Sequence, residues 1–140
     1  MTAGDQPSHE RFLAMMPLAV TLGIEIASAS PEEVVGRIRW RDDLCTAGGV
    51  MHGGALMAFA DTLGAVCAFL NLPPRAGTAT ISSSTNMLRA VREGEVTGTS
   101  RPLHAGRSVI AVQTELRDQQ DRLVAQVTQA QAVLGSSTQT

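Results

Sequence analysis

The longest uncharged stretch of this chain holds a single carboxylate near its middle. From Leu44 to Pro74 the only Asp, Glu, Lys or Arg is Asp61. Residues 54–70 within this stretch would be apolar on every side of a helix. That pattern is typical of a helix enclosed by other elements rather than one lying on a surface. The stretch therefore predicts one long buried helix, with Asp61 as its lone charge.

Strand-like patterns flank this helix on both sides. Alternation of apolar and polar residues predicts strands at residues 22–28, 34–40, 78–91, 94–103, 108–117 and 122–134. A short helix is expected at residues 10–23, where Pro17 ends or kinks it. The sequences "REGE" and "DQQD" are typical of hairpin turns, and Gly106 in "HAGR" is expected to take a positive φ.

Helices and strands do not alternate along the chain, which disfavours a parallel doubly wound sheet. We predict an α+β fold, in which an antiparallel six-stranded sheet wraps around one long buried helix and a short N-terminal helix precedes them. The 140 residues suit a single domain spanning 1–140, with polar, frayed ends at 1–8 and 135–140.

The composition narrows the classes of function. The chain has 11 basic and 13 acidic side chains, three Phe, one Trp and no Tyr. The chain has no excess of basic charge to attract nucleic acid and too few aromatic residues to stack on its bases. We therefore expect no nucleic acid as a partner. Two cysteines and no signal-like N-terminus predict a cytoplasmic protein without a disulfide framework. Three widely spaced histidines and no cysteine pair predict no metal site.

The apolar segment 55–72 is about long enough to span a membrane. An Asp at its centre would cost about 2.5–3.5 kcal/mol on insertion, and no Lys or Arg immediately flanks the segment. The amphipathic strands in the rest of the chain also indicate a globular protein. We therefore expect no membrane as a partner.

The start of the expected helix combines a histidine with two glycines. His52 directly precedes Gly53 and Gly54. The first N–H groups of a helix lack intrahelical partners and lie at its positive end, and glycines let a ligand approach that backbone closely. Such donors stabilise the oxygen that becomes negative during acyl transfer. Asp61, nine residues after His52, is then the candidate base or nucleophile.

The sequence "HGGALMAFAD" resembles the hot-dog-fold acyl-CoA thioesterases of the phenylacetate-degradation (PaaI-like) type. The resemblance extends from about residue 18 to residue 134 and includes "TNMLRAV", "SRPLHAGRS" and "RLVAQVTQ". It implies hydrolysis of an acyl-CoA thioester to a free acid and coenzyme A, with no cofactor, since coenzyme A is part of the substrate. The Gly53 N–H would polarise the thioester carbonyl, with Gly54 close by. Asp61 would attack or activate water, and His52 would orient the loop or the substrate.

Two positions depart from the pattern of that family. Many relatives carry Asn six residues before the His, where this chain has Thr46, whose hydroxyl can still bind water or substrate. Some relatives use a strand Ser near the position of Ala79, which here lies between Thr78 and Thr80. Asn86, further along the same expected strand, is expected to face the cleft.

Coenzyme A carries phosphates, which arginine binds through paired hydrogen bonds. Relatives often place basic residues at the "HAGR" turn, which makes His104 and Arg107 candidates for substrate binding. Arg89 is a third candidate. The alternative is scattered surface charge, for these arginines as for Arg92 and Arg101.

Gly53 and Asp61 are too far apart along a helix to act on one carbonyl within one chain. Eight residues at 1.5 Å each separate them by about 12 Å. We therefore expect a homodimer with shared active sites, in which Gly53 of one subunit faces Asp61 of the other. The resemblance agrees and also implies a tetramer built as a dimer of dimers.

Plainer interpretations exist for several of these residues. Asp61 would then be a structural carboxylate bonded to backbone amides. Cys45, near His52, is a candidate nucleophile or a small buried residue, and Cys67 is expected to pack within the helix. Three apolar side chains would line either an acyl tunnel or the core: Met51, Met57 and Phe59.

Two other functions compete with thioester hydrolysis. A non-catalytic acyl-CoA-binding module or sensor on the same fold would need the pocket but not Asp61. A hot-dog dehydratase carries a His and an acid for proton abstraction, with a different spacing and loop. The leading prediction is an acyl-CoA thioesterase.

Overall fold

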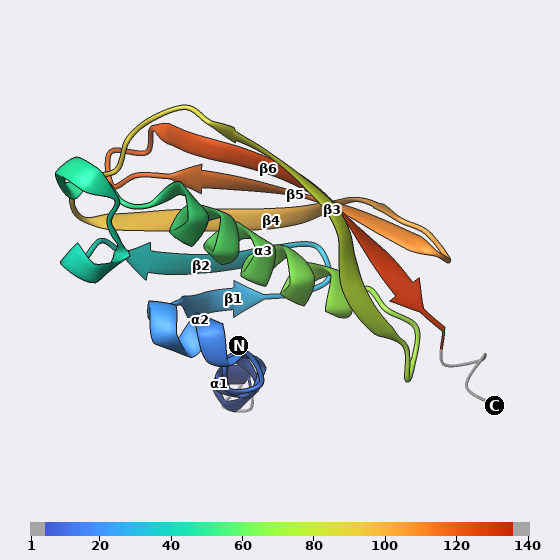
Figure 1. The fold of residues 1–140 in the computed structure, drawn as a ribbon. Coiled ribbons are helices and arrows are strands. Elements are labelled where there is room, and N and C mark those ends of the chain that lie inside the picture. Colours follow the sequence, from blue (N-terminus) through green and yellow to red (C-terminus); the bar gives the residue numbers. More distant parts are fainter. Residues whose placement is uncertain (1–4, 136–140) are drawn as a thin grey trace.

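A computed structural model describes residues 5–135 of the chain (Figure 1). Two 3-10 turns, Asp42–Leu44 and Ala47–Gly49, precede the long helix. Residues 1–4 and 136–140, part of the ends expected to be frayed, lie outside the described residues, whereas residues 5–8 belong to a helix. The helices and strands are α1 (Asp5–Ala14), α2 (Pro17–Leu22), β1 (Glu25–Ala29), β2 (Val34–Arg39), α3 (Gly53–Phe69), β3 (Gly77–Met87), β4 (Glu95–Ala105), β5 (Val109–Arg117) and β6 (Leu123–Leu134).

The six strands form one antiparallel sheet in the order β1-β2-β4-β5-β6-β3. α3 runs along one face of this sheet (Figure 1) and contacts all six strands. The expected antiparallel six-stranded sheet with one long helix is thereby confirmed.

The strand order differs from a simple succession of hairpins. β3 pairs with β6 at the edge of the sheet and not with β4, so the "REGE" segment is not a hairpin turn. Residues 88–94 instead carry the chain from the edge to the centre of the sheet. The Leu88 N–H donates to the Val124 carbonyl at 2.8 Å on the way, and Gly94 has a φ of 78°. The turn-forming residues between β3 and β4 thus change the direction of the chain, but the two strands that they connect do not pair with each other.

The other two expected turns do join paired strands. β5 and β6 meet at a turn closed by the Asp118 N–H, which donates to the Arg122 carbonyl at 3.0 Å, so the "DQQD" hairpin is confirmed. β4 and β5 meet at the "HAGR" turn. Gly106 does not take a positive φ, contrary to expectation. A Cβ at Gly106 would lie 2.9 Å from the Val109 carbonyl oxygen, so space rather than dihedral angle requires the glycine.

Two helices replace the single one expected at residues 10–23. Pro17 is the first residue of α2. An N–H at that position would have no intrahelical partner, so proline, which lacks it, is tolerated there. Gly23 caps α2 with a φ of 74°, so β1 begins at Glu25 and not at residue 22.

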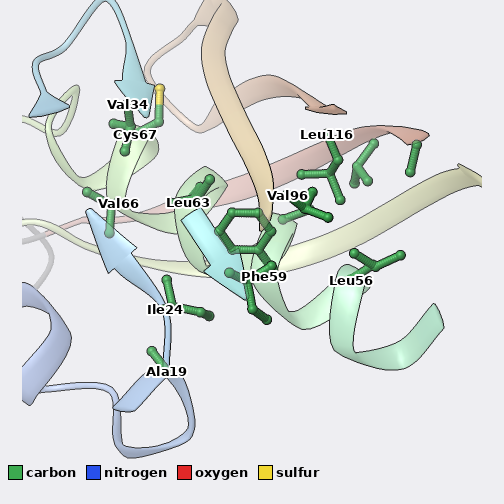
Figure 2. Packing of buried hydrophobic residues seen from close by; sticks show 14 of the residues in the cluster. Ala19, Ile24, Val34, Leu56, Phe59, Leu63, Val66, Cys67, Val96 and Leu116 are labelled. Atoms are coloured by element: carbon green, nitrogen blue, oxygen red, sulfur yellow. The ribbon is translucent and has the colours of Figure 1, made fainter. Parts of the chain in front are cut away.

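One side of α3 forms the centre of the core. Leu63 is fully buried against Gly36 of β2 and Gly98 of β4, where a Cβ would come within 2.6 Å of the Leu63 side chain. The two glycines therefore make a notch that Leu63 fills, which fixes the rotation of α3 on the sheet. Figure 2 shows Leu63 among other buried side chains, including Phe59, Val34, Val96 and Leu116.

The opposite side of α3 is not covered by residues 5–135. Gly54, Met57 and Phe69 are exposed, and Asp61 and Ala65 are half-buried. Residues 5–135 therefore do not enclose the helix fully, contrary to expectation, because the sheet covers one side of α3. An apolar helix face that contains one carboxylate is left open.

Within residues 5–135, no helix is long and apolar enough to cross a membrane. The cytoplasmic location stays a prediction.

Replacing Leu63 with Ala should lower the free energy of unfolding by about 2–5 kcal/mol, because the notch would be left as a cavity. Urea unfolding measures this change. Leu103→Ala, at a side chain that is 57% exposed on β4, is the matched control and should cost far less. Equal losses in the two variants would contradict the central role of the Leu63 contact.

Candidate active site

The loop before α3 is held by backbone hydrogen bonds. The Thr46 N–H donates to the Val50 carbonyl, and the His52 N–H donates to the Leu44 carbonyl, both at 2.8 Å. Between them Gly48 has a φ of 79°, which glycine adopts without strain. The loop therefore fixes the position of His52 and of the first turn of α3.

His52 is the N-cap of α3. Its Nδ1 accepts the Gly54 N–H at 2.7 Å, and its carbonyl oxygen accepts the Ala55 N–H at 2.9 Å. The Gly53 N–H has no hydrogen-bond partner among residues 5–135. The free donor at the positive end of the helix is therefore that of Gly53, whereas the Gly54 N–H is occupied by the cap.

Asp61 lies about two turns further along α3, on its open side. Thr80 Oγ1 donates to Asp61 Oδ1 at 2.9 Å, and Gln129 Nε2 donates to the same oxygen at 3.0 Å. Within residues 5–135 no hydrogen bond reaches Oδ2. The partners are side chains and not the backbone amides that a purely structural interpretation supposed.

Neutral polar side chains of β3 and β6 extend from this carboxylate into the protein. Gln129 and Gln131 are each only 1% exposed. Gln129 Nε2 donates to Gln131 Oε1 at 2.9 Å, and Gln131 Nε2 donates to Thr78 Oγ1 at 3.0 Å. The sequence analysis missed both glutamines. Alternation along β6 places them on the same face as the buried Val127, and a polar pair on a core-facing strand was the available signal.

The fold does not bring Gly53 and Asp61 together within one chain. α3 is continuous from Gly53 to Phe69, so the two residues are about 12 Å apart along its axis. His52 and Gly54 lie with Gly53. The candidate oxyanion donor and the candidate carboxylate therefore occupy different parts of one helix.

Two adjoining cavities lie near the start of α3. The first, of about 400 Å³, is lined by Gly53, Thr46 and Arg89, so the structure groups three of the expected site residues. The second, of about 340 Å³, shares Arg89 and adds Arg92 and Arg122. Glu93 and Asp118 also line the second cavity, and Arg122 pairs with Asp118 at 2.9 Å, so Arg89 is the arginine that lines the same cavity as Gly53.

Other expected site residues lie elsewhere. Asn86 is exposed near the end of β3, opposite Gln126 of β6. His104 and Arg107 belong to the β4–β5 hairpin, at the end of the sheet opposite to the start of α3 (Figure 1). A single chain therefore does not bring this hairpin to Gly53.

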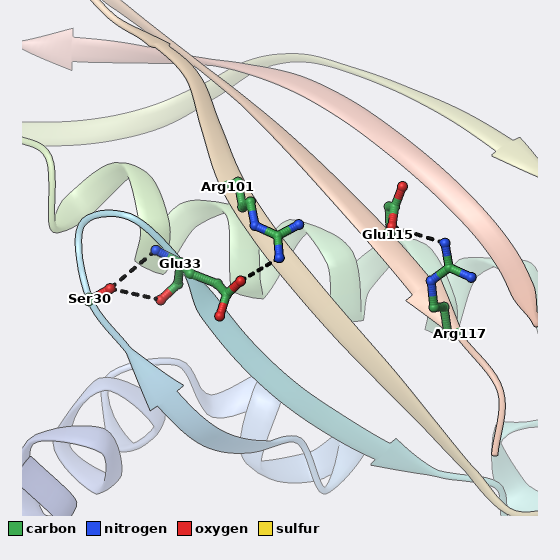
Figure 3. Close-up of polar contacts among 5 residues, drawn as sticks. All are labelled: Ser30, Glu33, Arg101, Glu115 and Arg117. Atoms are coloured by element: carbon green, nitrogen blue, oxygen red, sulfur yellow. Dashed lines mark hydrogen bonds and ion pairs between the residues drawn. The ribbon is translucent and has the colours of Figure 1, made fainter. Parts of the chain in front are cut away.

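Arg101 takes part in the surface charge pattern. It forms an ion pair with Glu33, which links β4 to the start of β2, as Figure 3 shows together with the Arg117–Glu115 pair on β5. Exposed pairs of this kind contribute about 0–1 kcal/mol. The surface interpretation therefore accounts for Arg101.

Neither cysteine is arranged as a nucleophile. Burial, with the charges of Asp42 and Asp43, raises the pKa of the Cys45 thiol, and its Sγ faces the Arg41 carbonyl at 3.5 Å. Cys67 is fully buried, and burial raises its pKa to about 11. Because the thiolate is the reactive form, both groups are poor nucleophiles at neutral pH.

The apolar candidates for an acyl tunnel separate into two groups. Met51 and Phe59 are buried in the core, which supports the packing interpretation for both. Met57 is exposed on the open side of α3.

Comparison with known proteins places the chain in a family. The model of the thioesterase superfamily matches residues 48–125, from the loop before α3 to the start of β6. A protein of Vibrio cholerae is 45% identical over 76 residues, which are 54% of this chain and 51% of that protein. The 1,4-dihydroxy-2-naphthoyl-CoA hydrolase of Escherichia coli is 33% identical over 75 residues, 54% of this chain and 55% of that enzyme. The chain thus spans about half the length of these two relatives.

The fold agrees with a solved structure over almost its whole length. A thioesterase from Haemophilus influenzae superposes with a TM-score of 0.86 at 24% identity, covering 96% of this chain and 93% of that chain. This likeness confirms the hot-dog fold, while the phenylacetate-degradation type stays a prediction. With the family match across α3 and its flanking loop, the chain belongs to the thioesterase superfamily.

Proposed function

We propose that this protein hydrolyses an acyl-CoA thioester to a free carboxylic acid and coenzyme A, with Gly53 and Asp61 as its catalytic residues. The observation that carries the proposal is the free Gly53 N–H at the positive end of α3, beside neighbouring N–H groups that His52 already satisfies. The name of the Escherichia coli relative, a CoA thioester hydrolase, supports the substrate class.

In this proposal the Gly53 N–H donates to the thioester carbonyl oxygen as it becomes negative, an interaction worth about 10²–10³ in rate. Asp61 acts in one of two ways. As a nucleophile, the carboxylate adds to the carbonyl carbon, the C–S bond breaks, coenzyme A leaves as a thiolate, and water cleaves the resulting anhydride. As a base, it takes a proton from water while the water oxygen adds to the carbon, and the proton ends on the departing sulfur.

No metal or prosthetic group has a role in the proposed reaction. The helix terminus supplies the polarisation that a metal would otherwise supply, and the carboxylate supplies the nucleophile or base. In the described part of the chain, no group of three or more His, Cys, Asp or Glu is placed to hold a metal ion.

We propose further that each site is shared between two copies of the chain. Within residues 5–135, β3 is an eleven-residue edge strand that pairs only with β6, and most of its length is exposed. Such a long free edge is a template for pairing with another chain. A second copy there would also lie beside the open side of α3, and its own Gly53 could then approach Asp61. Pairing of such dimers into a tetramer rests on the resemblance alone.

The acyl group would enter an apolar cavity of about 160 Å³ one helical turn beyond Asp61. Ala65 of α3 and Thr78 of β3 line it, four residues after Asp61 and two before its partner Thr80. Residues four apart on a helix, or two apart on a strand, lie on the same face. The cavity therefore lies next to the carboxylate. Phe12 and Phe69 also line it, and their rings make an edge-to-face contact at a centroid distance of 5.6 Å. An apolar cavity of about 150 Å³ holds a benzene ring, which favours a ring-sized acyl group.

Asp61→Asn should reduce kcat by at least about two orders of magnitude, since the shape is kept and the charge is lost. Release of free coenzyme A, followed with a thiol reagent, measures this. Asp121→Asn, at an exposed hairpin residue, is the matched control and should be as active as the wild type. A folded Asp61→Asn protein with near-normal kcat would show that the carboxylate is structural.

Arg89→Ala should raise KM for acyl-CoA by about tenfold with little change in kcat, because a charged hydrogen bond to phosphate contributes about 1.5–3 kcal/mol. The effect should vanish with a short acyl thioester that lacks the nucleotide. Arg107→Ala makes the same change in the β4–β5 hairpin. A nucleotide-dependent defect in that variant alone would place the phosphate site at the hairpin, and equal losses on both substrates would mean a role in folding.

A further inference from the structure

The two oxygens of the Asp61 carboxylate are in different surroundings. Oδ1 accepts hydrogen bonds from Thr80 and Gln129, at 2.9 and 3.0 Å, whereas Oδ2 accepts none within residues 5–135. We propose that Gln129 is a positioning residue for Asp61: its amide holds Oδ1, so that Oδ2 is the oxygen presented to the thioester or to the attacking water. This inference rests on the proposed function.

Gln129 is the buried member of the pair that holds Oδ1. It is only 1% exposed, and its Nε2 donates both to Asp61 and to Gln131 Oε1. Thr80 is exposed, and its single hydroxyl proton is shared between Asp61 Oδ1 and Gln131 Oε1, which lie 2.9 and 2.6 Å away. When Thr80 donates to Gln131, the Gln129 amide still holds the carboxylate.

The orientation of the Gln129 amide is determined by its neighbours. Its Oε1 is buried and has no hydrogen-bond partner among residues 5–135. Turning the amide over would direct that oxygen at the Asp61 carboxylate and at Gln131 Oε1, both acceptors. An unsatisfied buried acceptor is unfavourable, and native structures contain few of them. The structure therefore leaves Gln129 Oε1 without a partner and directs both amide hydrogens toward Asp61 and Gln131.

α3 is shaped to admit this amide. Gly64 lies against Gln129, and a Cβ at that position would overlap the carboxamide group. Glycine inside a helix is less favourable than alanine, so its presence one turn after Asp61 calls for a packing reason. Close approach of Gln129 supplies that reason and links the helix glycine, the strand glutamine and the carboxylate in one arrangement.

Gln129→Met is the primary test, because it keeps the length of the side chain and removes both donors. We expect a folded oligomer whose kcat for acyl-CoA falls about tenfold to a hundredfold with KM unchanged, since a misplaced catalytic group costs rate rather than binding. Gln126→Met, the same change on the same strand but on its other face, should be as active as the wild type. A folded Gln129→Met protein with kcat within about twofold of the wild type would overturn the proposal.

Gln129→Glu gives a signature that a packing role would not produce. The introduced carboxyl donates to Asp61 only when protonated and repels it when ionised. Asp61 is the ionisable group facing it, since the surrounding residues are neutral: Gly64 of α3, Ser83 of β3, Val112 of β5 and Gln131 of β6. The ratio of variant to wild-type activity should therefore rise as the pH is lowered, whereas the ratio for Gln129→Met should stay constant.

Gln129→Glu tests the positioning role even if Gln129→Met fails to fold, because Glu has the shape of Gln. A ratio that does not depend on pH would overturn the positioning role. The proposed function fails separately, through a wild-type protein that does not hydrolyse acyl-CoA or an active Asp61→Asn. A wild type that is active and an Asp61→Asn that is not, together with an unaffected Gln129→Met, would reject this inference alone.

Discussion

The packing of one side of α3 on the sheet is the constraint on which the candidate site depends. Leu63 fills a notch between Gly36 and Gly98, and Phe59 is buried one turn earlier on the same face. Residues three and four apart share a helix face, so burying this stripe turns Asp61 away from the core and toward β3. The direction of the only charge on α3 therefore follows from hydrophobic packing rather than from an electrostatic partner.

The same helix carries two chemical features that a single chain keeps apart. Among residues 5–135 its first N–H, at Gly53, has no partner, whereas His52 caps the next one, at Gly54, and its carboxylate is held by Thr80 and Gln129. No ion pair engages Asp61 in the described part of the chain, so its partners there are these two neutral side chains. The open side of α3 and the free edge of β3 are where a second copy would complete the site.

The parts of this arrangement that local patterns determine could be predicted from the sequence. The apolar stretch around Asp61 predicted α3, alternation predicted the six strands, and "HGG" predicted the polarised helix start. Strand order could not be predicted, because the pairing of β3 with β6 depends on contacts about fifty residues apart, such as Ser83 with Gln129. The open side of α3 was missed because an all-apolar helix does not reveal whether its own chain or another one covers it. Gln129 and Gln131 were missed because alternation shows that they share a strand face with Val127, but only the fold shows that this face lies against Asp61.

The central claim, that one site takes its oxyanion donor and its carboxylate from different chains, is tested most directly by mixing two inactive variants. Gly53→Pro removes the N–H at the first helical position, where proline is tolerated, and the φ and ψ of His52, −61° and 133°, suit a residue before proline. Asp61→Asn removes the carboxylate. After subunit exchange, verified with differently tagged chains, about half of the dimers are mixed and each has one intact site, so about a quarter of the wild-type activity should return. Verified exchange with no recovery of activity would contradict the claim.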